Sequence, residues 1–258
     1  MSMPLPDATI EGIGLWAAQA PSWDGYRTLL REGTPTVPAG RPAPALLPAN
    51  ERRRAPDTVL VALEAAHAAC TGSGRDPATL PSVFASACGD MAITDHMCRT
   101  LATSPLELSP TRFHNSVHNA AAGYWTIGTG AMAPATALSA GSASFAMGLL
   151  EALAQLHAGA PAVLLVGYDG PAPPMLRDVT PSEGLLGGAL VLARATQGVA
   201  RLVPRLEEGE APPAPAGVAD GNAMAPMLAL FEALALGGAT ACLPAGRGRR
   251  LHLELAHG

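Results

Sequence analysis

The chain has 258 residues, of which 48% are apolar and 14% are charged, enough for a sizeable core in one α/β domain or two small ones. Its net charge of −5 excludes the broad basic surface that binds nucleic acid or anionic lipid. The four cysteines form no C-x-x-C pair, which favours reduced thiols over a disulfide framework or a zinc site. With no signal peptide and no apolar run that could span a bilayer, we expect a cytoplasmic protein.

The first third of the chain predicts a strand, a long loop and a helix. The stretch TIEGIGLW, Thr9 to Trp16, has the pattern of a strand. Residues 32–56 are rich in proline and end near the basic run ERRR, so they predict an extended surface loop. The arginines read as a solvated face, with an acidic partner surface as the alternative. Asp57 is expected to cap a helix that runs to about Cys70.

A second strand is predicted over residues 80–87, entering a turn at Cys88. Cys88 is a candidate nucleophile, but no base lies next to it in sequence, so a structural thiol is preferred. A helix over about 93–101 and a loop to Asn115 follow. Small residues then predict a helix over 115–130 that another backbone can approach closely.

His114 and His118 are four residues apart, a spacing that chelates metal when both lie on one helix face. No third ligand is in view, and the glutamate of H-E-x-x-H is missing. We therefore interpret both as hydrogen-bonded structural histidines and predict no metal site.

Residues 134–158 predict a short strand, a tight turn and a helix. Gly141 supplies conformational freedom at the corner, and Ser142 or Ser144 can cap the helix. A helix N-terminus at such a corner favours an activated nucleophile. However, the sequence A-G-S-A-S lacks both glycines of G-x-S-x-G. The helix is apolar on nearly every face, so it should be buried on all sides.

The remaining elements are strands over residues 161–167, 185–193 and 201–206, a helix over 222–236 and a last strand over 250–255. Alternation of strands and helices indicates a layered α/β fold with right-handed crossovers. No G-x-G-x-x-G or Walker motif follows a strand, so no nucleotide cofactor is expected.

Three stretches of the sequence occur in the order and at the spacing that one protein family shows. They are SPTRFHNSVHNAAAGYWTIGTGAMAPATALSAGSASFAMGLLEAL, PAVLLVGYD and EGLLGGALVLAR. They resemble the N-terminal half of a β-ketoacyl-ACP synthase, and more narrowly the short chain-length-factor-like proteins of aryl polyene and related pigment clusters. HNSVHNAAAGYW is the most specific part. The resemblance implies one thiolase-like domain over residues 1–258, a mixed sheet with a buried central helix. Its matching core is 8–194, and 195–258 is a truncated C-terminal extension.

The resemblance also implies a missing nucleophile. In active synthases of this type the catalytic cysteine lies at the strand-to-helix corner, eight residues before a glycine of the helix. Counting back from Gly148 reaches Ala140, so alanine stands at the position of the cysteine. The family's two catalytic histidines belong to the second half, which this chain largely lacks. The resemblance thus implies a chain that is not an enzyme by itself and that uses no cofactor.

A partner is implied as well: a full-length β-ketoacyl-ACP synthase in a heterodimer, with an acyl carrier protein bound transiently through the complex. In the family, one strand pairs with its counterpart across the two-fold axis, and a loop reaches toward the partner's acyl tunnel. The dimer-interface candidates are Ala135, Thr136, Ala137, Leu138 and Ser139. The candidates to line or close the tunnel are Thr111, Arg112 and Phe113. The helix over 143–156 needs its far face covered by the helix over 222–236, by a partner, or by both.

The expected function is therefore that of a non-catalytic chain-length-factor-like subunit, which shapes the acyl tunnel during polyene, polyketide or fatty-acid-type elongation. One alternative is an acyl hydrolase or transferase in which Ser139, Ser142 or Ser144 works with His114 or His118 and the helix N-terminus forms an oxyanion site. The other alternative is a homodimeric binding module for an acyl carrier or a pigment precursor.

Overall fold

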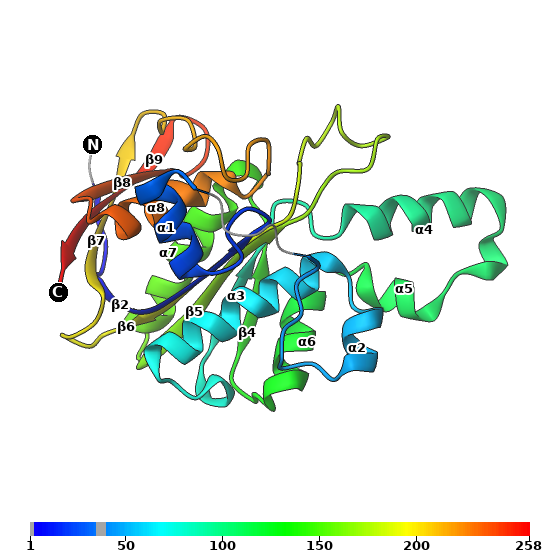
Figure 1. Ribbon diagram of the computed structural model, residues 1–258, viewed down its shortest axis with the longest axis horizontal. Helices are drawn as coiled ribbons and strands as arrows, with labels where there is room; N and C mark the ends of the chain where they lie inside the picture. Colours follow the sequence, from blue (N-terminus) through cyan, green and yellow to red (C-terminus); the bar gives the residue numbers. More distant parts are fainter. Residues whose placement is uncertain (1–2, 35–39) are drawn as a thin grey trace.

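The computed structural model describes residues 3–34 and 40–258 (Figure 1). Within them, nine strands form one mixed sheet in the order β4-β3-β5-β6-β2-β7-β9-β8, with β1 paired to β7. The strands are β1 Met3–Pro4, β2 Ala8–Ala17, β3 Ser82–Ala85, β4 Ala135–Leu138, β5 Ala162–Asp169, β6 Leu186–Ala193, β7 Ala200–Glu208, β8 Thr240–Pro244 and β9 Arg249–His257.

Helices cover both faces of this sheet. They are α1 Trp23–Glu32, α2 Ala49–Arg54, α3 Asp57–Ser73, α4 Met91–Thr103, α5 Pro110–Asn115, α6 Ala120–Thr129, α7 Ser144–His157 and α8 Leu228–Leu236. Helices α3 and α6 pack on one face, and α1, α7 and α8 pack on the other (Figure 1). None of the described helices combines the length and the apolar character that crossing a membrane requires.

Strand β5 shows why the core has two halves. All eight of its residues are buried, as its continuous apolar run predicts for a strand covered on both faces. Val163 and Leu165 belong to the core beneath α7, whereas Ala162, Leu164 and Val166 belong to the core beneath α3. Because side chains of a strand alternate between the faces, one apolar strand serves both layers. The predicted layered architecture is confirmed.

Two glycines let β2 lie directly against α3. A Cβ atom at Gly12 would lie 2.1 Å from the carbonyl oxygen of Ala69, and one at Gly14 would lie 2.0 Å from that of Ala65. Both distances are far inside van der Waals contact, so only glycine fits at these positions. The G-x-G spacing of the first strand therefore sets the distance between the sheet and its longest covering helix.

Several predicted elements need correction. Asp57 does not cap α3, because the cap position is Pro56 and no side chain bonds there; the Asp57 carboxylate instead pairs with Arg41. The loop predicted over 32–56 contains α2, and part of it lies outside the described residues. Helix α1 and strand β8 were not predicted. The helix expected over 222–236 begins as a 3₁₀ turn, η4 Ala225–Met227, and becomes α-helical at Leu228.

The segment after β6 continues the same sheet. Strand β7 pairs with β2 and with β9, and β8 is the edge strand at that end. Helix α8 packs beside α7, where the rings of Phe145 and Phe231 have centroids 5.9 Å apart. Part of the α7 surface is therefore covered by α8, as one of the predicted arrangements required.

Candidate functional site

The strand-to-helix corner has the predicted shape. Strand β4 ends at Leu138, and a 3₁₀ turn, η3 Gly141–Ala143, leads into α7. Gly141 has φ +58°, a conformation that L residues other than glycine rarely adopt. Ala140 is exposed at the turn. Its methyl group offers neither a nucleophile nor a hydrogen bond to a bound substrate.

The serines at the corner act differently from the prediction. Neither Ser142 nor Ser144 is the N-cap of α7, because that position is Ala143 and has no side-chain hydrogen bond. Ser144 is buried inside the first turn. Its Oγ accepts a hydrogen bond from the N–H of Ala140 at 2.9 Å and donates one to the carbonyl of Gly141 at 2.7 Å. This hydroxyl stabilises the corner and is not free to attack a substrate.

Ser139 is also engaged, since its hydroxyl donates to the carbonyl of Ala87 at 2.8 Å. Across the described part of the chain, no hydrogen bond joins Ser139, Ser142 or Ser144 to a histidine ring. A serine nucleophile needs a base within hydrogen-bond reach. The geometry of this corner gives the serine alternative no support.

The two histidines do not share a helix face, which corrects the predicted i, i+4 arrangement. His114 belongs to α5, where its ring lies 6.3 Å from the ring of Tyr124. His118 lies in the turn before α6, and its Nε2 is 3.0 Å from the carbonyl oxygen of Ser86. Among residues 3–34 and 40–258, no cluster of three or more histidine, cysteine or acidic side chains could hold a metal ion.

An unpredicted residue, Asp169, organises the loop after β3. Its carboxylate is fully buried and accepts hydrogen bonds from the Ser86 hydroxyl at 2.7 Å, the Ala87 N–H at 2.8 Å and the Cys88 N–H at 3.2 Å. Burial raises the pKa of Asp169 to about 6, although these hydrogen bonds and His118 oppose the shift. The sequence signal for this residue was a single charge at the end of an apolar strand.

Cys88 lies beside this carboxylate. Burial raises the pKa of its thiol, and the negative charge of Asp169 raises it further. A reactive cysteine needs the opposite environment, in which positive charge favours the thiolate. The structure therefore supports the interpretation of Cys88 as a structural thiol.

The three residues predicted to line a tunnel are in a helix, not in a loop. Ser109 accepts a hydrogen bond from the N–H of Arg112 at 3.4 Å and caps α5, whose first residue is Pro110. Ser-Pro is a helix-start signal, because proline suits the first helical position. Thr111 and Arg112 line a hollow between α3, α4 and α5, whereas Phe113 does not line it and is 62% exposed.

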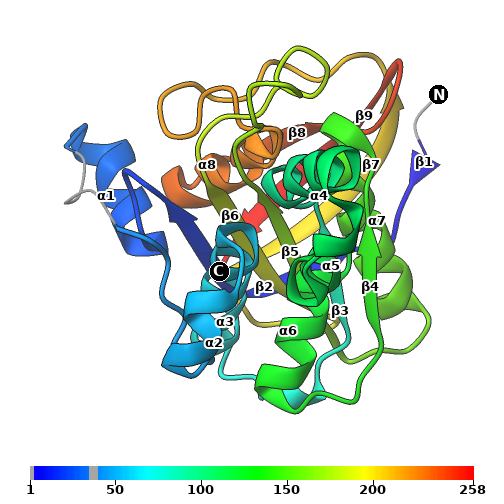
Figure 2. The same ribbon diagram turned by 90° about the vertical axis from the view of Figure 1, so that its right-hand side faces the viewer.

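Strand β4 lies at the edge of the sheet, and among the described residues it pairs with β3 alone. Ala135 and Ser139 are exposed, and Thr136 to Leu138 are half-buried. In Figure 2, this strand faces the viewer together with α4, α5 and α6. Large apolar side chains are exposed on or next to these helices: Leu101, Leu106, Phe113, Val117, Ile127 and Met132. An open edge strand beside exposed apolar side chains marks a surface suited to another chain.

Helix α7 is not buried on all sides, which corrects the prediction. Met147, Leu150, Glu151 and Gln155 are half-buried, and Ala154 is exposed. The amide of Gln155 donates to the Thr136 hydroxyl of β4 at 3.4 Å, which places this stripe next to the open edge of the sheet. The uncovered stripe and the edge strand therefore form one continuous face.

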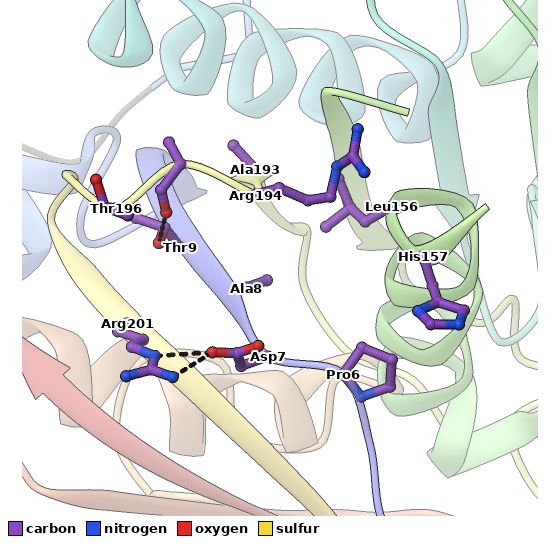
Figure 3. A pocket seen from close by; sticks show the side chains of 11 residues that line it. Pro6, Asp7, Ala8, Thr9, Leu156, His157, Ala193, Arg194, Thr196 and Arg201 are labelled. Atoms are coloured by element: carbon purple, nitrogen blue, oxygen red, sulfur yellow. Dashed lines mark hydrogen bonds and ion pairs between the residues drawn. The ribbon is translucent and has the colours of Figure 1, made fainter. Parts of the chain in front are cut away.

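A hollow at the ends of the central strands farthest from the Ala140 corner contains none of the predicted site residues (Figure 3). It has a volume of about 480 Å³ and lies between the start of β2 and the ends of β6 and α7. Its arginine at position 201 is neutralised by Asp7, and the Thr9 hydroxyl donates to the Ala195 carbonyl. The Arg201 guanidinium, the Asp7 carboxylate and the Thr9 hydroxyl are therefore already engaged by groups of the protein.

Comparison with known sequences identifies one family. The family model described as the β-ketoacyl synthase N-terminal domain matches residues 27–241. No curated protein sequence matches the chain.

Solved structures share the fold. A chain of the ketosynthase ApeO in complex with its chain length factor ApeC, from Xenorhabdus doucetiae, matches with TM-score 0.77 and 20% identity, over 96% of this chain and 99% of that one. The ishigamide ketosynthase/chain length factor matches with TM-score 0.71 and 15% identity, over 98% and 99%. A β-ketoacyl synthase from Burkholderia phymatum matches with TM-score 0.64 and 14% identity, over 79% and 65%. At these identities the likeness confirms the thiolase-like fold.

Proposed function

Because the chain belongs to the β-ketoacyl synthase N-terminal domain family, we propose that it is a non-catalytic, chain-length-factor-like subunit. It pairs with a full-length β-ketoacyl-ACP synthase and shapes the tunnel in which an acyl chain grows on its carrier protein. The synthase performs the condensation. The observation that carries the proposal is the exposed position of Ala140 at the strand-to-helix corner, the place at which the resemblance implies the cysteine of active synthases.

The geometry of the corner between β4 and α7 supports a non-catalytic role. Its backbone turn and helix N-terminus are intact, while the neighbouring hydroxyls of Ser139 and Ser144 hold backbone groups. A helix N-terminus favours nearby negative charge, but it contributes to catalysis only where a reacting group develops that charge. With alanine at the turn and the Ser139 and Ser144 hydroxyls engaged, Ser142 is the remaining exposed hydroxyl of the corner, and no hydrogen bond joins it to a histidine within the described residues.

The open face supports a partner. Strand β4 has one unpaired edge, and the exposed apolar side chains around it include Phe113 and Ile127. Two of the similar structures are, by name, ketosynthases with their chain length factors. A synthase that adds its own edge strand to β4 would satisfy the unpaired backbone groups and cover the stripe on α7. Phe113 would then lie at the interface between the two subunits.

Elongation by the reconstituted pair tests this proposal. We expect the synthase with this chain to extend an acyl primer with malonyl-ACP, and this chain alone to extend nothing. Ser142→Ala should leave the rate within about twofold of the wild-type pair, because an exposed hydroxyl that takes no part in the chemistry contributes nothing to the barrier. Ser139 and Ser144 stay unchanged in this test, since their hydroxyls hold the backbone of the corner. A loss of more than a hundredfold, with the pair still assembled, would instead support a serine-dependent acyl transferase.

A further inference from the structure

The segment from α4 to α5, residues 91–115, projects from the body of the molecule as an arm (Figure 1). Of the 13 residues of α4 only the first, Met91, is buried, and of the 6 residues of α5 only the last, Asn115. The 3₁₀ turn between the two helices, η2 Pro105–Glu107, has no buried residue. The arm is therefore anchored to the body mainly at its two ends.

The hydrogen bonds of the arm are local. Among the described residues, the side chains of 92–115 bond only to groups of residues 90–115, such as Arg99 to Asp95. The arm also touches α6, where the rings of His114 and Tyr124 have centroids 6.3 Å apart. Segments with few buried side chains and few bonds to the rest of a protein move at a low cost in free energy.

Two hollows separate the arm from α2 and from the loop before it. One, of about 440 Å³, lies between α3 and the two helices of the arm, and the other, of about 780 Å³, lies between α2, α5 and α6. Arg54 of α2 and Thr111 of α5 line both hollows. Packed elements leave few voids of this size, so α5 has room to move toward α2.

The side that faces the arm is held in place. Arg41 donates hydrogen bonds to the carbonyls of Arg52 and Ala55, at 2.8 and 2.6 Å. Arg52 donates to those of Pro44 and Leu47, at 3.3 and 3.0 Å. Two guanidinium groups thus tie the loop before α2 to the ends of that helix. A movement that narrows the hollows is therefore a movement of the arm.

Each end of the arm has a turn that can act as a hinge. Gly89, with φ +64°, precedes α4, and the turn at residues 116–117 follows α5. The backbone beyond both turns is fixed. The Asp169 carboxylate bonds the N–H groups just before Gly89, and His118 Nε2 lies 3.0 Å from the carbonyl oxygen of Ser86. A few residues that change conformation between fixed parts are what a hinge requires.

We propose that the arm is a lid with two positions. One is the extended position of Figure 1, and the other is a closed position in which α5 rests against α2 and the hollows are filled. Closing removes apolar side chains that line the hollows, such as Ile93 and Ile127, from water. Within the described chain, no hydrogen bond of residues 92–115 to the body has to break. In the closed position Phe113 leaves the open face, so a synthase on that face selects the extended position; this consequence rests on the proposed function.

Distances between two spin labels on the full chain test the lid. One label is attached to Cys98 of α4 and the other to Arg53→Cys of α2, both at exposed positions. The half-buried Cys88 and Cys242 are replaced by serine. The labelled chain is diluted with unlabelled chain to suppress distances between copies. We expect two distances, of which the shorter belongs to the closed arm.

Two comparisons make the result specific. Thr111→Trp fills the hollows and should abolish the shorter distance, whereas Leu106→Trp, at a fully exposed position that lines neither hollow, should keep it. Labels at Arg53→Cys and Ala154→Cys, both on the body, should give one distance in a chain with Cys98→Ser.

Three results would overturn the proposal. These are a single distance between the arm and α2, a shorter distance that survives Thr111→Trp, or two distances between the labels on the body. The distances are measured on this chain alone, so their outcome is separate from that of the elongation assay.

Discussion

At the scale of single residues, Asp169 is the group on which the corner depends. It holds the loop after β3 through Ser86, Ala87 and Cys88, and Ala87 in turn accepts the hydrogen bond from Ser139. Its folded-state pKa of about 6 lies above the ordinary aspartate value of 3.8. The stability that Asp169 contributes is thus complete below about pH 4 and is lost as the pH rises through about 6.

Replacing Asp169 by asparagine should remove this pH dependence. Between pH 4 and pH 7, the free energy of unfolding of the wild type should fall by about 2–3 kcal/mol relative to Asp169→Asn, since one pKa unit corresponds to about 1.4 kcal/mol. Chemical denaturation at a series of pH values measures the difference. Asp178→Asn, at an exposed position, is the control. If the free energies of unfolding of the wild type and of Asp169→Asn change with pH in the same way, the carboxylate has the same pKa in the folded and unfolded states, which would contradict this prediction.

Residue roles were only partly visible in the sequence. The alanine at the corner could be located by counting from Gly148, because a turn and a helix fix that spacing. Asp169 could not be assigned a role, since its three donors come from a loop about 80 residues earlier in the chain. The histidine pair was misplaced for a local reason: the helix breaks between His114 and His118.

At the scale of elements, the contact of β2 with α3 predicts a sharp contrast between two glycines. Gly14→Ala should destabilise the chain by about 3 kcal/mol or more, because its Cβ would lie 2.0 Å from the carbonyl oxygen of Ala65. Gly123→Ala in α6 should stabilise it by roughly 0.5–1 kcal/mol, since nothing lies near the added methyl group. Thermal unfolding of both variants checks the pair, and similar destabilisation of both would contradict the packing described.

The backbone of β4 allows its two edges to be tested separately. Ser82 donates to the carbonyl of Pro134, and Ser86 to that of Leu138. In a parallel ladder, alternate residues bond to the same neighbour, so Thr136 points its N–H toward β3 and Ala137 points its N–H to the open edge. Proline removes one N–H from a strand without further loss only when that N–H is unpaired.

Ala137→Pro should therefore abolish pairing with the synthase while the chain itself loses little stability. Thr136→Pro is the matched control, because it breaks the ladder with β3 and should lower the melting temperature of the isolated chain. Pull-down with a tagged synthase and thermal unfolding give the two readings. If Ala137→Pro still binds the synthase normally, the open edge of β4 does not form the interface with the synthase.

Elements with a clear hydrophobic pattern in the sequence were predicted well. Elements that depend on tertiary contacts were not. The continuous apolar run of β5 and the strand-turn-helix of β4 and α7 could be read directly. Helix α1 was missed because it is short and precedes a proline-rich segment, and β8 because its five residues include a terminal proline. Helix α7 was predicted to be buried all round, but the described residues leave its side beside β4, which includes Met147 and Leu150, only half-buried.

At the scale of the whole molecule, the sheet ends differently on its two sides. At one end, the edge strand β8 pairs with β9 and packs against α8. At the other end, β4 is open and surrounded by exposed apolar side chains. The predicted division into a core over 8–194 and an extension over 195–258 stays a prediction, although strands from both parts share one sheet.

The central claim is that this open end of the sheet, at β4, binds a β-ketoacyl-ACP synthase. The most direct measurement is the native mass of the species formed when the untagged chain is expressed with a tagged synthase from the same gene cluster. We predict a one-to-one complex that persists through purification, and no stable homodimer of this chain when the synthase is absent. A stable homodimer of this chain that ignores the synthase would contradict the account and favour the homodimeric binding module.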